Sequence, residues 1–179
     1  MIEIKQASEH DVEVLALLGR VTWIETFGAL FHNWEDVQDY ANETFSIKTL
    51  RSFIENPKGK IWVAYYNGIP IGYSKIELGA ESDQVKGNNI CKLVNIYVLH
   101  DFHSKKIGSL LLSKVLDEVV GLQCDKLWLS VLHTNTKAIN LYKKNNFYTA
   151  GTFDYIIGAN SFIMNTMVRD FNVDELNSI

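Results

Sequence analysis

The stretch Tyr97–Leu112 reads Y-V-L-H-D-F-H-S-K-K-I-G-S-L-L-L and predicts the end of a strand, a polar loop and the start of a helix. The residues that lead into it, Ile90–Val98, are rich in the β-branched and aromatic side chains that strands favour. Apolar residues then recur mostly at steps of three and four, as on one face of a helix: Ile107, Leu110, Leu111, Val115, Leu116 and Val119. The first N–H groups of such a helix have no partner within it, and the helix dipole is positive at that end. The joint is therefore a candidate phosphate-binding site.

Length and composition indicate one domain over residues 1–179, with a hydrophobic fraction of 47%. No apolar run approaches the roughly 20 residues of a membrane span, and the start of the chain predicts no signal peptide. The net charge of −4 argues against nucleic acid as the main partner. Cys91 and Cys124 show no metal or redox spacing, which predicts a reducing cytoplasmic setting and no metal site.

Strand and helix patterns alternate along the chain. Strands are predicted at 2–5, 61–66, 71–78, 90–98, 126–132, 147–157 and 161–169, and helices at about 11–26, 35–45, 47–54, 107–119 and 135–144. Asn67-Gly68 predicts a tight hairpin turn between the second and third strands. Hairpins followed by a strand–helix–strand–helix segment predict an α/β (α+β) fold with a mixed sheet covered by helices.

A second pattern, N-T-K-A-I-N-L-Y-K-K-N-N-F, runs from Asn135 to Phe147 after the buried strand at 126–132. Asn135, or Thr136 beside it, is a good helix N-cap. Tyr142 lies seven residues beyond Asn135, two helical turns away, so both belong to one face of the helix. A cap and a half-buried tyrosine explain this spacing as well as a functional pair does.

Together the two patterns resemble those of the GCN5-related N-acetyltransferases (GNATs), which bind acetyl-CoA. The GNAT phosphate loop, Gln/Arg-x-x-Gly-x-Gly/Ala, falls on His103, Lys106 and Gly108, of which only Gly108 matches. The GNAT pattern Asn-x-x-Ala-x-x-x-Tyr-x-x-x-Gly-Phe matches at four of five specified positions, with Asn146 in place of glycine. The resemblance covers about residues 60–171 and implies a mostly antiparallel sheet of six to seven strands flanked by helices.

The resemblance also implies how the chain holds acetyl-CoA, with CoA as the product. Backbone of Ile96, Tyr97 and Val98 would pair with pantetheine and polarise the thioester carbonyl. Asn135 would bond the pantetheine region, and Tyr142 would contact the cofactor and be the general acid for the leaving thiolate. Backbone N–H groups of the loop would hold the pyrophosphate, and they belong to His103, Ser104, Lys105, Lys106, Ile107, Gly108 and Ser109.

Four lysines lie near these positions in the sequence, and their presence there has two explanations. Their charges would attract the phosphates of the cofactor, or they form an ordinary solvated face. They are Lys105, Lys106, Lys143 and Lys144.

The chain departs from the GNAT pattern in its loop and in its strand. Ser104 and Lys106 stand where the family often has glycine. Replacing glycine would cost about 1–2 kcal/mol at a position that needs a positive φ. The strand before the loop often carries a carboxylate in the family, whereas this chain has Lys92 and Val94 there. The usual base that deprotonates the amine is therefore missing.

Three side chains are alternatives for that base, and a chain of water molecules without a dedicated base is another. The three are Glu77, Glu25 and His100.

Residues from Val21 to Ile47 include no lysine or arginine and carry a charge of −5, against −4 for the whole chain. The carboxylates are Glu25, Glu35, Asp36, Asp39 and Glu43. The same stretch holds six aromatic residues: Trp23, Phe27, Phe31, Trp34, Tyr40 and Phe45. Acids attract a protonated amine and aromatic rings bind it by cation–π contacts. Alternatively, the rings are core and the acids lie on a solvated helix face.

In the GNAT layout the first helices line the acceptor site. The segment Thr22–Phe27 also resembles part of the PaiA-type polyamine N-acetyltransferases. The candidates for binding the acceptor are Trp23, Glu25, Phe27 and Glu77.

The leading hypothesis is an acetyl-CoA-dependent N-acetyltransferase that acts on a primary amine of a small molecule, such as a polyamine, by direct attack in a ternary complex. Acetylation of a protein or peptide is one alternative, and a non-catalytic CoA-binding module is another. Pairing of the aromatic-rich C-terminal strands would give a homodimer.

Overall fold

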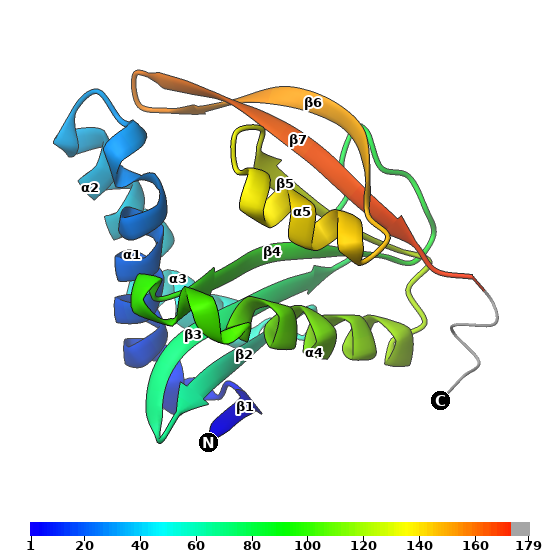
Figure 1. The fold of residues 1–179 in the computed structure, drawn as a ribbon, viewed down its shortest axis with the longest axis horizontal. Helices are drawn as coiled ribbons and strands as arrows, with labels where there is room; N and C mark the ends of the chain where they lie inside the picture. The colour runs from blue at the N-terminus through cyan, green and yellow to red at the C-terminus, as the bar shows by residue number, and fades with distance from the viewer. Residues whose placement is uncertain (173–179) are drawn as a thin grey trace. The chain divides into compact units, whose positions relative to one another are not determined.

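The computed structural model describes residues 1–172, and its elements follow the predicted order (Figure 1). The strands are β1 (Ile2–Gln6), β2 (Gly59–Tyr66), β3 (Ile69–Leu78), β4 (Ile90–Val98), β5 (Lys126–Leu132), β6 (Tyr148–Ile157) and β7 (Asn160–Asp170). The α-helices are α1 (Val12–Phe27), α2 (Trp34–Thr44), α3 (Ile47–Glu55), α4 (Ile107–Gly121) and α5 (Thr136–Lys144). Short 3₁₀ helices are η1 (Glu9–Asp11), η2 (Gly28–Leu30) and η3 (His100–Lys105).

The seven strands form one sheet in the order β1-β2-β3-β4-β5-β7-β6. β1 pairs with β2 and β5 pairs with β7 in antiparallel fashion, whereas β4 and β5 are parallel. This confirms the predicted mixed, mostly antiparallel sheet of seven strands flanked by helices. The parallel pair is the one whose crossover connection contains η3 and α4, as a parallel connection requires.

Contacts group the chain into two compact units. Unit 1 contains Met1–Lys75, Asn95–Leu112 and Ile157–Asn160, and unit 2 contains Ile76–Val94, Ser113–Ile156 and the described residues from Ser161. Each unit is assembled from separate parts of the chain, so residues far apart in sequence meet within it.

Helices α1 and α3 pack against β2 in unit 1. Capping chemistry starts both helices: Ser8 and Asp11 form a capping box at η1, just before α1, and the Ser46 side chain accepts from the backbone N–H of Thr49 at α3. Their apolar faces then form a core cluster of Val12, Leu15, Leu18, Leu50, Ile61, Val63 and Tyr73.

The buried face of α4 follows a four-residue step through Ile107, Leu111, Val115 and Val119, none of which is exposed. The sequence prediction was wrong at Leu110, which is 41% exposed, and it left out Leu112, which is fully buried. The two residues lie on opposite sides of the apolar stripe. The spacing of apolar residues alone does not decide which of these sides is buried against the core.

Positive φ angles occur where the sequence predicts tight turns. Asn67 and Gly68 have φ of 50° and 82°, as a two-residue hairpin turn between β2 and β3 requires. Asn146 has a φ of 64° just after α5, which confirms that asparagine takes the left-handed position of the family's glycine.

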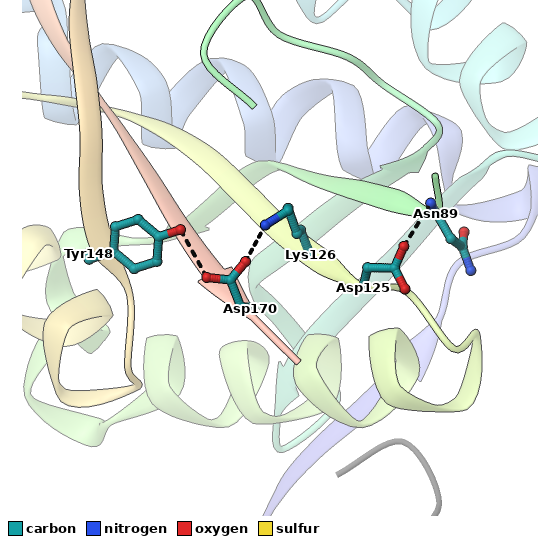
Figure 2. Close-up of polar contacts among 5 residues, drawn as sticks. All are labelled: Asn89, Asp125, Lys126, Tyr148 and Asp170. Atoms are coloured by element: carbon teal, nitrogen blue, oxygen red, sulfur yellow. Dashed lines mark hydrogen bonds and ion pairs between the residues drawn. The ribbon is translucent and has the colours of Figure 1, made fainter. Parts of the chain in front are cut away.

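In unit 2 the carboxylate of Asp170 links β5, β6 and β7, as Figure 2 shows. Asp170 Oδ2 accepts a 2.8 Å hydrogen bond from the Tyr148 hydroxyl, and Asp170 Oδ1 pairs with the Lys126 ammonium. The hydrogen bond from Lys126 lowers the pKa of Asp170. Beside this group the backbone N–H of Asn89 donates to Asp125 Oδ2 at 3.1 Å, which fastens the start of β4 to the start of β5.

No helix among residues 1–172 is long and apolar enough to cross a membrane. Within the same residues, no group of three or more His, Cys, Asp or Glu side chains could hold a metal ion.

Candidate active site

The predicted phosphate loop lies in unit 1 and contains a short helix of its own. Residues 100–105 form η3, Lys106 follows in the left-handed conformation with φ 58° and ψ 20°, and α4 starts at Ile107. The Lys106 carbonyl accepts from the N–H groups of Ser109 and Leu110, both at 3.1 Å. The N–H groups of Ile107 and Gly108 come before these in the helix, so no carbonyl within α4 is in place to accept from them.

Side chains of the loop fasten it to the neighbouring strands. The His103 ring donates from Nε2 to the carbonyl of Val98 at 2.9 Å. The Phe102 ring lies 5.6 Å from the Tyr66 ring, and Lys105 Nζ lies 4.9 Å from the centre of that same ring. His103 and Lys105 thus shape the loop with their side chains, in addition to the backbone role expected of them.

The end of β4 is held closely against β3. The Leu99 N–H donates to the Ile71 carbonyl at 2.9 Å. A Cβ added to Gly72 would lie 2.7 Å from the Tyr97 carbonyl oxygen, so only glycine lets β3 approach here. This support fixes the backbone of Ile96–Val98, the segment expected to pair with pantetheine.

The residues present fit an anionic diphosphate. Two N–H groups at the start of α4 point out of the helix end, and the side chains of Lys105 and Lys106 are exposed beside them. The side chain of Ser104 lies outside the described part of the structure, and its expected contribution is a backbone N–H. The two N–H groups belong to the backbone, so they are available whatever side chains stand at 104 and 106.

An aromatic cluster next to the loop, also in unit 1, centres on Trp23, which is only 4% exposed. Its ring stacks on Tyr40 at 4.5 Å and meets Phe31 at 5.5 Å and Phe27 at 5.9 Å. Trp23 is therefore a core residue, which agrees with the alternative that the aromatic residues of this stretch pack in the core. Phe27 is one of the half-buried residues around it.

Tyr97 joins this cluster to the strand that would carry the thioester. Its ring lies 6.2 Å from Phe27 and 5.9 Å from Tyr73, in edge-on arrangements. Tyr97 was expected to act through its backbone, so the position of its ring is new information. Tyr97 thus has its backbone in the segment predicted to pair with pantetheine and its ring against Phe27 and Tyr73.

Glu25, near the end of α1, reaches the first residue of the loop. Its Oε2 accepts a 3.1 Å hydrogen bond from the backbone N–H of His100, and its side chain is exposed. The His100 ring lies 5.3 Å from the ring of His103, and His100 Nδ1 is 3.9 Å from Asp101 Oδ1. Two of the three proposed bases, Glu25 and His100, are thus neighbours in unit 1.

The other acids of the 21–47 stretch divide into two kinds. Glu35, Asp39 and Glu43 are exposed on α2, in agreement with a solvated helix face. Asp36 is half-buried and accepts hydrogen bonds from the turn between β6 and β7. The sequence offered no local sign of this contact, because its partners lie more than 120 residues away.

The second predicted motif lies in unit 2, where Asn135 caps α5. Its Oδ1 accepts from the Ala138 N–H at 3.2 Å, and its backbone carbonyl accepts from Ile139 at 3.0 Å. The cap uses the amide oxygen of Asn135. Its amide nitrogen is the donor suited to pantetheine.

Tyr142, seven residues further on, is 8% exposed. Burial raises the pKa of its phenol to about 12, so the group is neutral and able to donate a proton at physiological pH. Its ring contacts Phe147 at 5.6 Å. Lys143 and Lys144 are exposed in the last turn of α5, where a cation also complements the helix dipole.

Lys92 and Glu77 lie in unit 2, on the strands where the GNAT carboxylate is missing. Lys92 Nζ lies 4.6 Å from the centre of the Trp128 ring. Burial lowers the pKa of Lys92, and the nearby charge of Glu77 partly opposes this. Glu77 is half-buried, and its described partner is this lysine.

Comparison with known proteins identifies the fold and the family. The profile of the Acetyltransferase (GNAT) family matches residues 29–147. An uncharacterised N-acetyltransferase of Mycobacterium tuberculosis is 24% identical over 136 residues, which is 76% of this chain and 83% of that protein. A spermidine N(1)-acetyltransferase of Thermoplasma acidophilum is 25% identical over 158 residues, which is 84% of this chain and 91% of that protein.

Among solved structures, PaiA N-acetyltransferase from Thermoplasma acidophilum in complex with coenzyme A aligns with a TM-score of 0.73 and 22% identity. The alignment covers 96% of this chain and 99% of the other. The family profile spans both predicted cofactor motifs and ends at Phe147. The chain belongs to the GNAT family of N-acetyltransferases, which use acetyl-CoA as the acetyl donor.

Proposed function

We propose that this enzyme acetylates a primary amine of a small cationic molecule, of the polyamine class. The observation that carries the proposal is the position of Glu25. Its exposed carboxylate is bound to the first N–H of the predicted cofactor loop, in the same unit as the paired Phe27 and Tyr97 rings. An exposed carboxylate in a stretch that holds six aromatic residues and no lysine or arginine suits a protonated amine.

Relatives support the same substrate class. The Thermoplasma acidophilum protein that is 25% identical is named for spermidine. Its similarity extends over 84% of this chain and 91% of that protein.

Acetyl-CoA, when bound, supplies an acetyl group activated as a thioester. The N–H groups of Ile107 and Gly108 would hold its diphosphate, and the backbone of Ile96–Val98 would orient the thioester. Tyr142 would donate a proton to the thiolate when the amine attacks directly in the ternary complex. The other loop N–H groups, the Asn135 amide and the cations of Lys105, Lys106 and Lys144 would complete the cofactor contacts.

Glu25 is our candidate for holding the amine and taking up its proton. It is exposed in unit 1 and bound to the first residue of the predicted cofactor loop, whereas Glu77 is half-buried in unit 2, where its charge acts on Lys92. Phe27 would contact the acceptor directly. Trp23, which is buried, would act by supporting Phe27 from behind.

Titration calorimetry with acetyl-CoA followed by an amine panel tests the proposal. We expect acetyl-CoA to bind and spermidine or spermine to release CoA faster than a peptide with a free N-terminus. Preference for the peptide would support protein acetylation instead. Binding without turnover on any amine would support the non-catalytic module, and no binding would reject both.

Three further expectations belong to the same proposal. We infer that residues 1–179 act as one catalytic domain, in a cytoplasmic setting. A homodimer would form through the C-terminal strands, because β6 ends the sheet and both β6 and β7 carry large exposed apolar residues: Tyr148, Tyr155, Ile156 and Ile163. Light scattering on the purified protein would measure the mass and decide between monomer and dimer.

A further inference from the structure

Asp36, in the first turn of α2, is the centre of a hydrogen-bond network within unit 1. Its Oδ2 accepts from Asn33 Nδ2 at 2.9 Å, from the backbone N–H of Ala159 at 3.0 Å and from Asn160 Nδ2 at 2.8 Å. The Asp36 N–H donates in return to Asn33 Oδ1 at 2.8 Å, which caps α2. One carboxylate thus joins the start of α2 to the turn between β6 and β7, which reaches α2 in Figure 1.

Asn160 completes the network from the other side. It is only 4% exposed, and its Oδ1 accepts from the backbone N–H of His32 at 3.1 Å. Both ends of this buried amide are therefore bound, one by Asp36 in the first turn of α2 and the other by His32 just before that helix. A buried amide with both ends satisfied defines one geometry for the turn, because any other would leave its polar atoms unpaired.

The backbone of the turn is shaped for this contact. Gly158 has a φ of 55°, and a Cβ added there would lie 2.1 Å from Asp36 Cγ. Only glycine permits the carboxylate to approach so closely. Ile157, just before it, packs against the cluster of Trp23, Val37, Ala41 and Phe45.

The turn therefore belongs to the same aromatic cluster that includes Phe27 and Tyr97. In unit 1 this cluster draws on α1, on α2, on the end of β4 and on the turn Ile157–Asn160. The last of these is held by polar contacts to Asp36 and His32 and by the packing of Ile157.

We propose that Asp36 is a positioning residue that fixes the turn Ile157–Asn160 as part of the acceptor-binding wall, and that this wall sets selectivity among amines. The inference rests on the proposed function, since it assigns the acceptor to the aromatic cluster. Asp36 itself does not contact the amine in this proposal. Its charge is satisfied by three donors of the protein, which distinguishes it from the exposed acids of α2.

The test compares Asp36→Asn with Asp39→Asn, which removes the same charge from an exposed position of the same helix. All three donors bind Oδ2, so asparagine at 36 can keep an oxygen in that place, but its neutral amide accepts three hydrogen bonds more weakly than the carboxylate does. We expect the KM for the best amine to rise about tenfold in Asp36→Asn, as loss of a charge-assisted hydrogen bond predicts. The KM for acetyl-CoA and all values for Asp39→Asn should stay within about twofold of wild type.

Hydrogen exchange separates positioning from mere folding. The peptide containing Ala159 should exchange at least about tenfold faster in Asp36→Asn, while peptides of β5 keep their wild-type protection. Faster exchange together with an unchanged amine KM would overturn the inference, because Asp36 would then be only structural. Unchanged exchange would overturn it as well.

Gly158→Ala is the second variant, and it displaces the turn while leaving the Asp36 charge in place. It should reproduce the rise in amine KM. It should also bring the ratio of acetylation rates for spermidine and a small monoamine closer to one. A wild-type enzyme that acetylates no amine would reject the proposed function. An active wild type with normal amine KM in both variants would reject this inference alone.

Discussion

Glu25 and His100 lie 75 residues apart in the chain and are joined by a 3.1 Å hydrogen bond from a backbone N–H to a carboxylate oxygen. The bond connects the last turns of α1 to the first residue of η3. An exposed acid thereby links α1, the helix proposed to line the acceptor site, to the predicted cofactor loop. This position motivates the role proposed for Glu25 and makes its charge and its hydrogen bond separately testable.

Glu25→Gln keeps an oxygen that can accept from His100 but removes the negative charge. We expect the KM for a cationic amine to rise about tenfold, since an exposed ion pair with the amine contributes on the order of 1 kcal/mol. The dissociation constant for acetyl-CoA, measured by calorimetry, should change less than about twofold. Glu13→Gln in the same helix is the control, and an equal effect there would point to general charge rather than to Glu25.

Lys106→Gly should stabilise the cofactor loop relative to Lys106→Ala. Both variants remove the charge, but only glycine relieves the cost of a φ of 58°, which is about 1–2 kcal/mol. The free energy of unfolding, measured with urea, should be at least about 1 kcal/mol higher for the glycine variant than for the alanine variant. Calorimetry with acetyl-CoA on the same pair separates effects of loop shape from the lost cation, because the charge change is identical.

Tyr142→Phe tests the proton donor. We expect kcat to fall about a hundredfold, in the usual range for loss of a general acid, with acetyl-CoA binding nearly intact. Tyr148→Phe, at an exposed hydroxyl in the same unit, should leave kcat unchanged. An unaltered kcat in Tyr142→Phe would remove this phenol from the mechanism.

Stability at high pH reports the burial of the same phenol. Because its pKa is raised from 10.0 to about 12 in the folded protein, the neutral form is favoured on folding. Its contribution, about 3 kcal/mol, is fully present below pH 10 and is lost as the pH rises through about 12. The free energy of unfolding should therefore fall more steeply between those values in wild type than in Tyr142→Phe, and equal slopes would contradict burial of the phenol.

Asn146→Ala should destabilise the protein by about 1 kcal/mol, because alanine tolerates the left-handed φ of 64° less well than asparagine. Asn146→Gly should leave stability unchanged or raise it slightly. Thermal unfolding of the pair measures the difference. Equal melting temperatures would show that the turn after α5 relaxes to another conformation.

Local chemistry made much of the fold predictable. The Asn67-Gly68 turn and the Asn135 cap depend on residues within three positions of one another, and each forms as expected. The spacing of apolar residues likewise placed α4 and its buried stripe. It failed at Leu110, where the edge of the stripe is decided by neighbours in the tertiary structure.

The candidate site was less predictable, for the opposite reason. The contact of Glu25 with His100 and that of Asp36 with Asn160 join residues 75 and 124 positions apart, and no local pattern encodes either. The sequence treated Asp36 as one of five equivalent acids. Burial and partners, which depend on the whole fold, distinguish it from the other four.

The discontinuous composition of unit 1 has a consequence for biosynthesis. Its last segment, Ile157–Asn160, is made only after the ribosome has passed residue 156, although α1 to α3 emerge among the first 75 residues. During translation, α1 and α2 are therefore complete before the turn that packs on them has been made. Part of their aromatic cluster stays exposed to solvent until then. We expect truncated chains that stop before Gly158 to bind chaperones and resist refolding, since non-local contacts of this kind form late.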